Sequence, residues 1–278
     1  MLISLVLCTV GRADEVHDFI HSIVSTQRNV ELIIVDQNKD DRIAIILERV
    51  SFPVNIIVKH IRTDTLGLSR ARNIGLKHVT GDVFAFPDDD CIYSRHVLDY
   101  LEDKFFTSGF DFFSCRTHQK NSPFSSLIKC PNDYFEIVMD RRAGCSFTLF
   151  FKNNEKTKGV SFDEAMGVGA GTYYGAGEET DYITQMLYLK CKGYYDPSLI
   201  VYHDAKEEAY NSSTLARLVS YGGGYSYHIR KNHMKLGKFY SLKLLFAIPL
   251  RILRTLNNKE EFIKALYFAK GTLNGLFK

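Results

Sequence analysis

The stretch "VFAFPDDDC", residues 83–91, passes from four apolar residues directly into a proline and three adjacent aspartates. A short apolar run bounded by turn residues is typical of a strand buried on both faces, as in a parallel sheet. Three neighbouring carboxylates repel one another, so their position at a strand end indicates that a cation sits among them. Because side chains alternate in extended backbone, Asp88 and Asp90 can reach one target while Asp89 turns away. A solvated acidic turn is the simpler alternative.

Carboxylate oxygens of this kind suit Mg²⁺ or Mn²⁺ better than softer metals. These ions usually keep several waters and share phosphate oxygens with a substrate instead of being caged by protein alone. The aspartate triplet therefore predicts a site for Mn²⁺ or Mg²⁺ as a cofactor.

The sequence before the triplet alternates strand-like and helix-like segments. Such alternation predicts an α/β fold, with a mostly parallel sheet flanked by helices. The expected strands are residues 2–10, 31–36, 54–61 and 82–86, and the expected helices are residues 16–24, 41–50 and 69–79. Ligands of such sheets bind at the carboxyl ends of the strands. Thr9, Arg12 and Asp36 follow strand ends, so we expect them on the same rim as the triplet.

The rest of the chain has weaker patterns. Residues 140–152 contain the clearest strand in the middle region, and residues 198–203 form a last strand that ends at His203. Between them, five glycines in residues 167–177 predict a pliable loop before a helix that starts near Tyr182. The "YGGGYSYH" of residues 221–228 suggests a hinge into the C-terminal region.

Charge is distributed unevenly along the chain. The net charge is +3, but residues 212–278 hold twelve lysines and arginines against two glutamates, which gives this tail +10 and leaves −7 elsewhere. An acidic body argues against nucleic acid as a partner and favours membrane phosphates as the target of the tail. Its apolar stretch is interrupted by Lys243, Pro249 and Arg251, so it is too short to span a bilayer but can lie on a membrane surface. A helical hairpin packed on the core is the alternative.

The six cysteines show no CxxC pair and no zinc-binding spacing, and several lie in apolar stretches. We expect them to be reduced core residues of a cytoplasmic protein. Met1 leads straight into the first strand without the basic and small-residue segments of a signal peptide. The expected location is therefore the cytoplasm, with attachment to the inner face of the cell membrane through the tail.

Four stretches carry a family resemblance through their order and spacing. Together they resemble the family 2 inverting nucleotide-sugar glycosyltransferases, whose fold is called GT-A. The stretches are "ISLVLCTVGR" (3–12), "IIVDQNKDD" (33–41), "GLSRARNIGLKHVTGDVFAFPDDDC" (67–91) and "GAGEETDY" (175–182). The likeness covers about residues 1–205. It implies a Rossmann-like mixed, mostly parallel sheet flanked by helices, followed here by a C-terminal helical tail.

The resemblance also implies a domain organisation. We expect a GT-A domain over residues 1–211, divided into a nucleotide-binding half (1–95) and an acceptor and catalytic half (96–211). The basic amphipathic tail would occupy residues 212–278.

The resemblance assigns the donor site to residues from three of the four stretches. Asp90 would be the main metal ligand, with Asp88 nearer the ribose, and His203 would complete the metal site unless it is a buried structural histidine. The nucleotide sugar would be held by Thr9, Arg12, Asp36, Ser69, Arg72, Asn73, Asp88 and Asp89. A guanidinium such as that of Arg72 can fork onto phosphate oxygens, although a salt bridge to the acidic rim is the structural alternative.

Inverting transfer needs a base on the face opposite the leaving group, close enough to take the proton of the acceptor hydroxyl. Glu179 takes the family position of this base, one methylene longer than the usual aspartate, and Asp181 is the second candidate. Acids in the first turn of a helix also complement its dipole, which is the purely structural explanation of these residues. Arg141, Arg142, Cys145 and Ser146 are weaker candidates for the border of the acceptor site.

The resulting hypothesis is a metal-dependent transferase. It would move a sugar from a nucleoside-diphosphate sugar, most simply a UDP-sugar, to a hydroxyl of a glycan acceptor. Relatives with similar tails extend lipid-linked glycans, which suggests bacterial surface polysaccharide biosynthesis. The alternatives are a sugar-phosphate nucleotidyltransferase, although its Gly-Gly-x-Gly-Thr-Arg loop is missing, and a nucleotide-sugar-binding module without catalysis.

Overall fold

The structure, a computed structural model, describes residues 1–120, 130–204 and 210–277, which form two compact units. The first unit comprises Met1–Leu66, Ala71–Ser161 and Leu189–Ala205. The second comprises Gly67–Arg70, Phe162–Tyr188 and Lys206–Lys278. The second unit thus contains the glycine-rich loop and the acidic helix as well as the tail, a division that differs from the expected boundary at residue 212.

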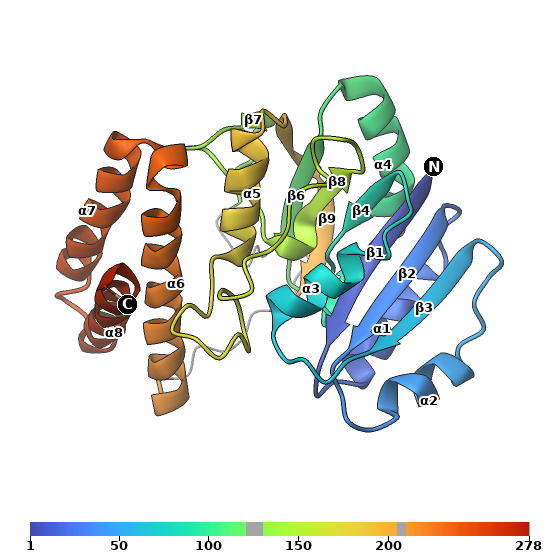
Figure 1. Cartoon of the computed structure of the whole chain (residues 1–278), viewed down its shortest axis with the longest axis horizontal. Helices are drawn as coiled ribbons and strands as arrows, with labels where there is room; N and C mark the ends of the chain where they lie inside the picture. Colours follow the sequence, from blue (N-terminus) through green and yellow to red (C-terminus); the bar gives the residue numbers. More distant parts are fainter. Residues whose placement is uncertain (121–129, 205–209, 278) are drawn as a thin grey trace. The chain divides into compact units, whose positions relative to one another are not determined.

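The first unit is built on one mixed sheet, which confirms the predicted fold class (Figure 1). In the described residues the strand order is β3-β2-β1-β4-β8-β6-β9-β5, with β7 paired to β9. Strands β1 to β4 are parallel to one another, β6 and β9 are also parallel, and the other pairings are antiparallel. The strands are β1 (Leu2–Thr9), β2 (Asn29–Asp36), β3 (Ile56–Arg62), β4 (Val83–Ala85), β5 (Cys91–Tyr93), β6 (Phe112–His118), β7 (Phe135–Ile137), β8 (Leu149–Lys152) and β9 (Gly193–His203).

Strands β1 and β2 determine which residues share an edge of the sheet. They pair in register from Leu2 with Asn29 to Thr9 with Asp36, so their carboxyl ends finish together. Both are almost wholly buried because helices cover the sheet; the apolar residues of α1 (Asp14–Ile23) and α4 (Arg95–Ser108) pack into the same core as β1 and β2. The predicted rim at the ends of these two strands is confirmed.

Other helices of the first unit link these strands. Helix α2 (Arg42–Arg49) lies between β2 and β3, and α3 (Leu68–Leu76) lies between β3 and β4, with its first turn belonging to the second unit. A single turn of 3-10 helix, η1 (Ser146–Thr148), precedes β8. The sequence had indicated β8 but not α4 or β6, because β6 mixes polar and aromatic residues while almost all of its side chains are buried.

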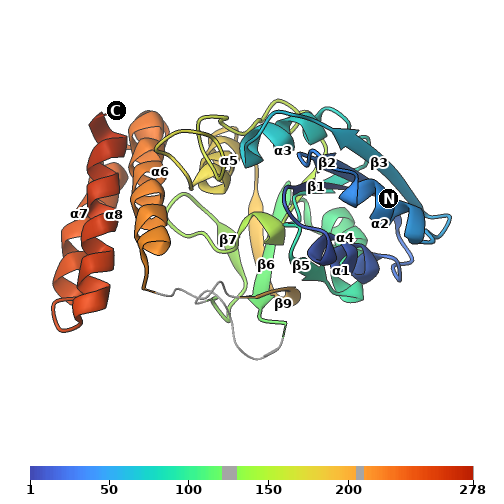
Figure 2. The ribbon, with the colours of Figure 1, turned by 90° about the horizontal axis from the view of Figure 1, so that it is seen from below.

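The second unit contains four helices in its described residues: α5 (Glu178–Tyr188), α6 (Ser212–Leu236), α7 (Lys238–Arg254) and α8 (Lys259–Phe277). Helices α6, α7 and α8 lie side by side in both views (Figures 1 and 2). Among the described residues, no helix has both the length and the apolar character that a membrane-spanning helix needs.

The predicted hinge at residues 221–228 is wrong, because this segment lies in the middle of α6, whose 25 residues run without a break. Gly222 of this segment, together with Gly271 of α8, instead allows two helix backbones to touch. A Cβ atom on Gly222 would lie 2.0 Å from the carbonyl oxygen of Phe268 in α8, and one on Gly271 would lie 1.9 Å from that of Val219 in α6. Since no side chain fits at such distances, glycine is needed here for close packing.

A buried carboxylate joins the parallel strands of the first unit. Glu31 of β2 is 3% exposed and accepts hydrogen bonds from Ser4 Oγ (2.6 Å), Thr80 N (3.0 Å), Thr80 Oγ1 (2.8 Å) and Lys59 Nζ (2.5 Å). Burial alone would raise the pKa of Glu31, but the bonds from Lys59, Ser4 and Thr80 outweigh it and lower the pKa. The carboxylate therefore links β1, β2, β3 and the turn before β4.

We predict that Glu31→Gln lowers the free energy of unfolding at pH 7 by roughly 1.5–3 kcal/mol, since hydrogen bonds to a charged group are lost. Because the folded pKa of Glu31 is lowered, its contribution is complete above the unfolded-state pKa and disappears as the pH falls through the folded pKa. The difference between wild type and variant should therefore shrink between pH 5 and pH 3 in urea titrations. Glu48→Gln on the exposed side of α2 is the control, and a pH-independent difference would contradict the account.

Candidate functional site

The aspartate triplet lies where three strands of the first unit end. Pro87 follows the apolar run, and Asp88 forms an isolated bridge with Cys8 at the end of β1. Strand β5 then starts at Cys91, which pairs in register with His203, the last residue of β9. This register brings Asp90 and His203 together, although they are more than a hundred residues apart in sequence.

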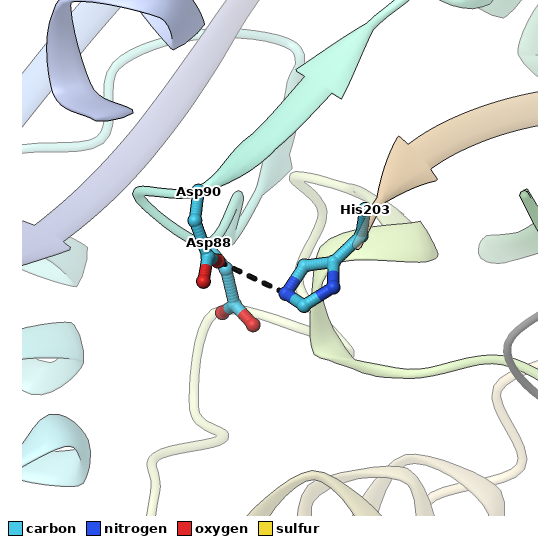
Figure 3. Close-up of side chains that lie close together, drawn as sticks. All are labelled: Asp88, Asp90 and His203. Carbon is cyan, nitrogen blue, oxygen red and sulfur yellow. Dashed lines mark ion pairs between the residues drawn. The ribbon is translucent and has the colours of Figure 1, made fainter. Parts of the chain in front are cut away.

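Asp88, Asp90 and His203 form a group that could hold a metal ion (Figure 3). Each offers one ligand atom, and these atoms lie within 4.8 Å of one another. Asp90 Oδ1 is 2.9 Å from His203 Nε2. Two ligands bound at right angles about 2.1 Å from an octahedral ion would lie roughly 3.0 Å apart, so this pair already has the spacing of adjacent ligands. Two carboxylates and an imidazole suit Mn²⁺.

The imidazole of His203 is held in this orientation from two sides. Its ring stacks on Phe147, with centroids 4.6 Å apart and planes within 10°. Its Nδ1 lies 2.7 Å from the carbonyl oxygen of Asp204, an acceptor that places a proton on Nδ1 and leaves Nε2 facing Asp90. A second partner of this kind is usual for metal-binding histidines.

Two arginines neutralise the aspartates. Arg12 Nη1 lies 2.5 Å from Asp89 Oδ1 and 2.5 Å from Asp90 Oδ2, while Thr9 Oγ1 donates to Asp89 Oδ2 at 2.7 Å. Arg72, only 1% exposed, contacts Asp88 at 3.1 Å. Asp89 contacts Thr9 and Arg12, and Asp88 and Asp90 belong to the metal-capable group. The predicted alternation is not seen, because residues 89–90 form a turn and Arg12 contacts both Asp89 and Asp90.

Charge pairing affects protonation within this cluster. Burial alone would raise the pKa of Asp90, but the hydrogen bond and charge of His203, together with Arg12, hold that pKa well below its usual range. In the same way, Asp90 raises the pKa of His203 against the opposing effect of burial. The pKa of Asp89 is raised, chiefly by burial. Asp90 is therefore held in its ionised form, as a metal ligand must be.

Asp36 lies on the neighbouring strand and is fully buried. Its Oδ1 accepts hydrogen bonds from the backbone and side-chain nitrogens of Asn38, at 2.9 and 2.8 Å, and its Oδ2 lies 2.9 Å from His60 Nε2. The carboxylate thereby shapes the loop after β2. A polar cavity of about 450 Å³ adjoins this loop and is lined by Asn38, Lys39, Arg62, Thr63 and Asp64.

The remaining donor-site candidates lie on or near α3. Asn73 follows Arg72 and is partly buried, in the first unit. Ser69 belongs to the second unit, where it is 1% exposed and its hydroxyl donates to the carbonyl oxygen of Met166 at 2.7 Å. In the structure, then, the hydroxyl of Ser69 joins α3 to the glycine-rich loop.

The weaker acceptor candidates separate into two groups. Ser146 Oγ accepts a hydrogen bond from Arg72 at 2.9 Å and lies 3.4 Å from Asp88, so it belongs with the aspartate cluster. The guanidinium of Arg141 lies over the ring of Phe135 at 4.0 Å, and Arg142 donates to the carbonyl oxygen of Met139. These arginines organise their own loop.

The two candidate bases at the start of α5 differ sharply in their surroundings. Asp181 is fully buried and accepts hydrogen bonds from Asn232 Nδ2 (2.6 Å), Lys231 Nζ (2.9 Å) and Gln185 Nε2 (2.9 Å). These partners and His228 outweigh burial and hold the pKa of Asp181 well below its usual range. Glu179 is partly exposed. A carboxylate committed to three donors is a poor proton acceptor, which makes Asp181 a weak candidate for the base.

Several partners of these residues were missed in the sequence. His60, Phe147, His228, Lys231 and Asn232 all contact a predicted site residue. The last three share one face of α6 through their spacing of three and four residues, but no local pattern ties that face to Asp181. Only the fold joins them.

The chain was compared with known proteins. The sequence model described as Glycosyl transferase family 2 matches residues 4–166. A mannosyltransferase from Pyrobaculum calidifontis, solved with GDP-Man and Mn²⁺, superposes with a TM-score of 0.66 at 12% identity, covering 99% of this chain and 87% of that one. TarS 1–349 from S. aureus, solved with UDP-GlcNAc, superposes with a TM-score of 0.64 at 12% identity, covering 100% and 93%. No curated protein matches the chain.

The two solved structures share the fold at low identity, and the family match covers more than half of the chain. The order of strands and the polar rim at their carboxyl ends agree with this assignment. The protein belongs to glycosyl transferase family 2 and is a glycosyltransferase.

Proposed function

We propose that this enzyme transfers a sugar, with inversion, from a nucleoside-diphosphate sugar to a hydroxyl of a glycan acceptor, using Mn²⁺ or Mg²⁺. The observation that carries the proposal is the group formed by Asp88, Asp90 and His203. Two structures of the same fold were solved with GDP-Man and Mn²⁺ and with UDP-GlcNAc, which supports a nucleotide-sugar donor and a divalent ion. A UDP-sugar is our first choice of donor.

Asp88, Asp90 and His203 would hold the ion. When bound, it would neutralise charge that develops on the diphosphate as it leaves. Arg12 and Arg72 supply fixed positive charge beside the same carboxylates, and guanidinium groups suit phosphate oxygens. Asp36, with Asn38 and the adjoining polar cavity, would accommodate the nucleoside.

Glu179 is our proposed base. It would accept the proton of the acceptor hydroxyl as the hydroxyl oxygen attacks the anomeric carbon, and the bond from that carbon to the diphosphate oxygen would break on the opposite face. Asp181 would have a structural role, since Lys231 and Asn232 already occupy its oxygens.

We also propose that α7 rests on an anionic membrane surface. Five apolar side chains at helical spacing are at least half exposed: Phe239 (92%), Leu242 (52%), Phe246 (66%), Leu250 (50%) and Leu253 (60%). Lysines and arginines accompany them, including Arg251 and Arg254 in the last turn. An exposed apolar stripe with basic neighbours is suited to the boundary of lipid headgroups and acyl chains. Such contact would bring the enzyme to a lipid-linked acceptor at the cytoplasmic face.

For the donor site, we predict that a nucleotide sugar and Mn²⁺ together raise the melting temperature of the wild type more than either alone, because donor phosphates complete the ion's ligands. Asp90→Asn should abolish this joint effect, measured by differential scanning fluorimetry across UDP- and GDP-sugars. Asp103→Asn, on an exposed position of α4, is the matched control and should keep the effect. A joint shift that survives Asp90→Asn would refute the assignment of the metal site.

For the base, we predict that Glu179→Gln lowers kcat for transfer by about 10²–10⁴-fold, since an amide cannot accept the proton. Its donor-dependent shift in melting temperature should match that of the wild type. Asp181→Asn should instead lower the free energy of unfolding by about 2–3 kcal/mol, because charged hydrogen bonds from Lys231 and Asn232 are weakened. Normal turnover by Glu179→Gln would eliminate it as the base.

For the membrane, we predict that the protein sediments with vesicles containing phosphatidylglycerol and less with pure phosphatidylcholine. The double change Phe239→Ser and Phe246→Ser should weaken this binding at least tenfold, because both rings are exposed and apolar. Phe106→Ser, at a similarly exposed ring in the first unit, is the control. Equal binding by the double variant and the wild type would show that α7 is not the contact.

A further inference from the structure

The second unit contains a pocket of about 220 Å³ that no role above uses. It is lined by residues 176–177, Thr180, Tyr221, Tyr225, His228 and Phe268. The first three of these positions flank the acidic pair Glu178–Glu179 at the start of α5. The pocket therefore borders the turn of chain that carries the proposed base, within the same unit.

We propose that this pocket binds one pyranose ring of the acceptor glycan, an inference that rests on the proposed function of Glu179. A sugar ring has an apolar face of C–H groups and an edge of hydroxyls. The electron-rich face of an aromatic ring attracts such C–H groups, and the pocket has three aromatic walls, Tyr221, Tyr225 and Phe268. The remaining surface of the pocket is almost wholly apolar, and Thr180 and His228 are the lining residues nearest in kind to a partner for the sugar's hydroxyls.

The size of the pocket limits its occupant. Pockets that enclose drug-sized ligands measure roughly 300–1,000 Å³, so 220 Å³ has room for one ring and not for an oligosaccharide. A membrane-lipid chain would need a longer groove. Tyr221 and Tyr225 are partly exposed, so a ring can reach them from solvent.

The walls of the pocket are held in place by the packing of α6 and α8. Tyr221, Tyr225 and His228 lie on one face of α6, at spacings of four and three residues. Phe268 of α8 lies beside these residues because Gly222 lets the backbone of α8 approach α6. A Cβ on Gly222 would lie 2.0 Å from the Phe268 carbonyl oxygen. The rings of Tyr225 and Phe268 are consequently 5.8 Å apart between centroids.

Asp181 has a positioning role in this arrangement. His228 is 4% exposed, and its Nδ1 lies 3.8 Å from Asp181 Oδ1 and 3.2 Å from Asn232 Nδ2. These contacts fix the imidazole at the pocket wall. The buried carboxylate of α5 thus orients a polar group for the acceptor without touching it.

The absence of tryptophan from the chain permits a direct binding test. Phe268→Trp would place the protein's one tryptophan in the pocket wall and keep an aromatic face there. Phe106→Trp, exposed on α4 of the first unit, is the matched reporter elsewhere. Both proteins would be titrated, without donor or metal, with the methyl pyranosides of glucose, galactose, mannose, rhamnose and N-acetylglucosamine.

We expect at least one methyl pyranoside to give a saturable change in the emission of Phe268→Trp and none in that of Phe106→Trp. In the Phe268→Trp protein, adding Tyr225→Ala should weaken this binding at least tenfold, whereas Tyr225→Phe should preserve it. In transfer assays with that pyranoside as acceptor, Tyr225→Ala should raise the acceptor KM and leave the donor-dependent melting shift unchanged.

No saturable change with any of the five sugars would overturn the proposal. A saturable response to farnesol, without one to the sugars, would assign the pocket to a lipid chain and would also overturn it. Because these titrations need neither donor nor metal, their failure is distinct from failure of the proposed transfer reaction.

Discussion

The pairing of three adjacent aspartates with cationic side chains is the interaction on which the first unit's site depends. Three carboxylates at one strand end would repel one another, and each has its own compensation: Arg72 for Asp88, Arg12 for Asp89, and Arg12 with His203 for Asp90. These partners come from the loop after β1, from α3 and from the end of β9. The triplet can therefore be tolerated only when the central strands are assembled in the observed order.

Much of this site could be predicted because its residues lie close to strand ends. The apolar runs of β1, β2 and β4 are continuous, so the sequence locates their ends and with them Thr9, Asp36 and Asp88. Arg12 was placed at this rim by its position after the first strand, and Arg72 was recognised through a family resemblance, but their pairing with particular aspartates depends on the sheet register. Asp181 shows the limit of such reasoning, since its partners on α6 lie about fifty residues away and follow no local pattern. Strand β6, in the middle of the chain, was not predicted because it is buried despite its polar residues.

The two carboxylates at the start of α5 are similar side chains that differ in burial and in their contacts. Asp181 is enclosed by a lysine, two amides and an imidazole, which makes it a fixed anion that organises α5 and α6. Glu179, two residues earlier, is partly exposed. The family resemblance places Glu179 first and Asp181 second as the base, and the surroundings of Asp181 make it the weaker of the two.

The glycine contacts between α6 and α8 limit how this enzyme could diversify. Where two main chains touch, any side chain larger than that of glycine would clash, so the close approach of α6 and α8 behind the aromatic rings depends on keeping these glycines. Evolution or engineering of a new substrate preference would therefore proceed by exchanging the rings themselves on an unaltered scaffold, rather than by moving the helices that present them.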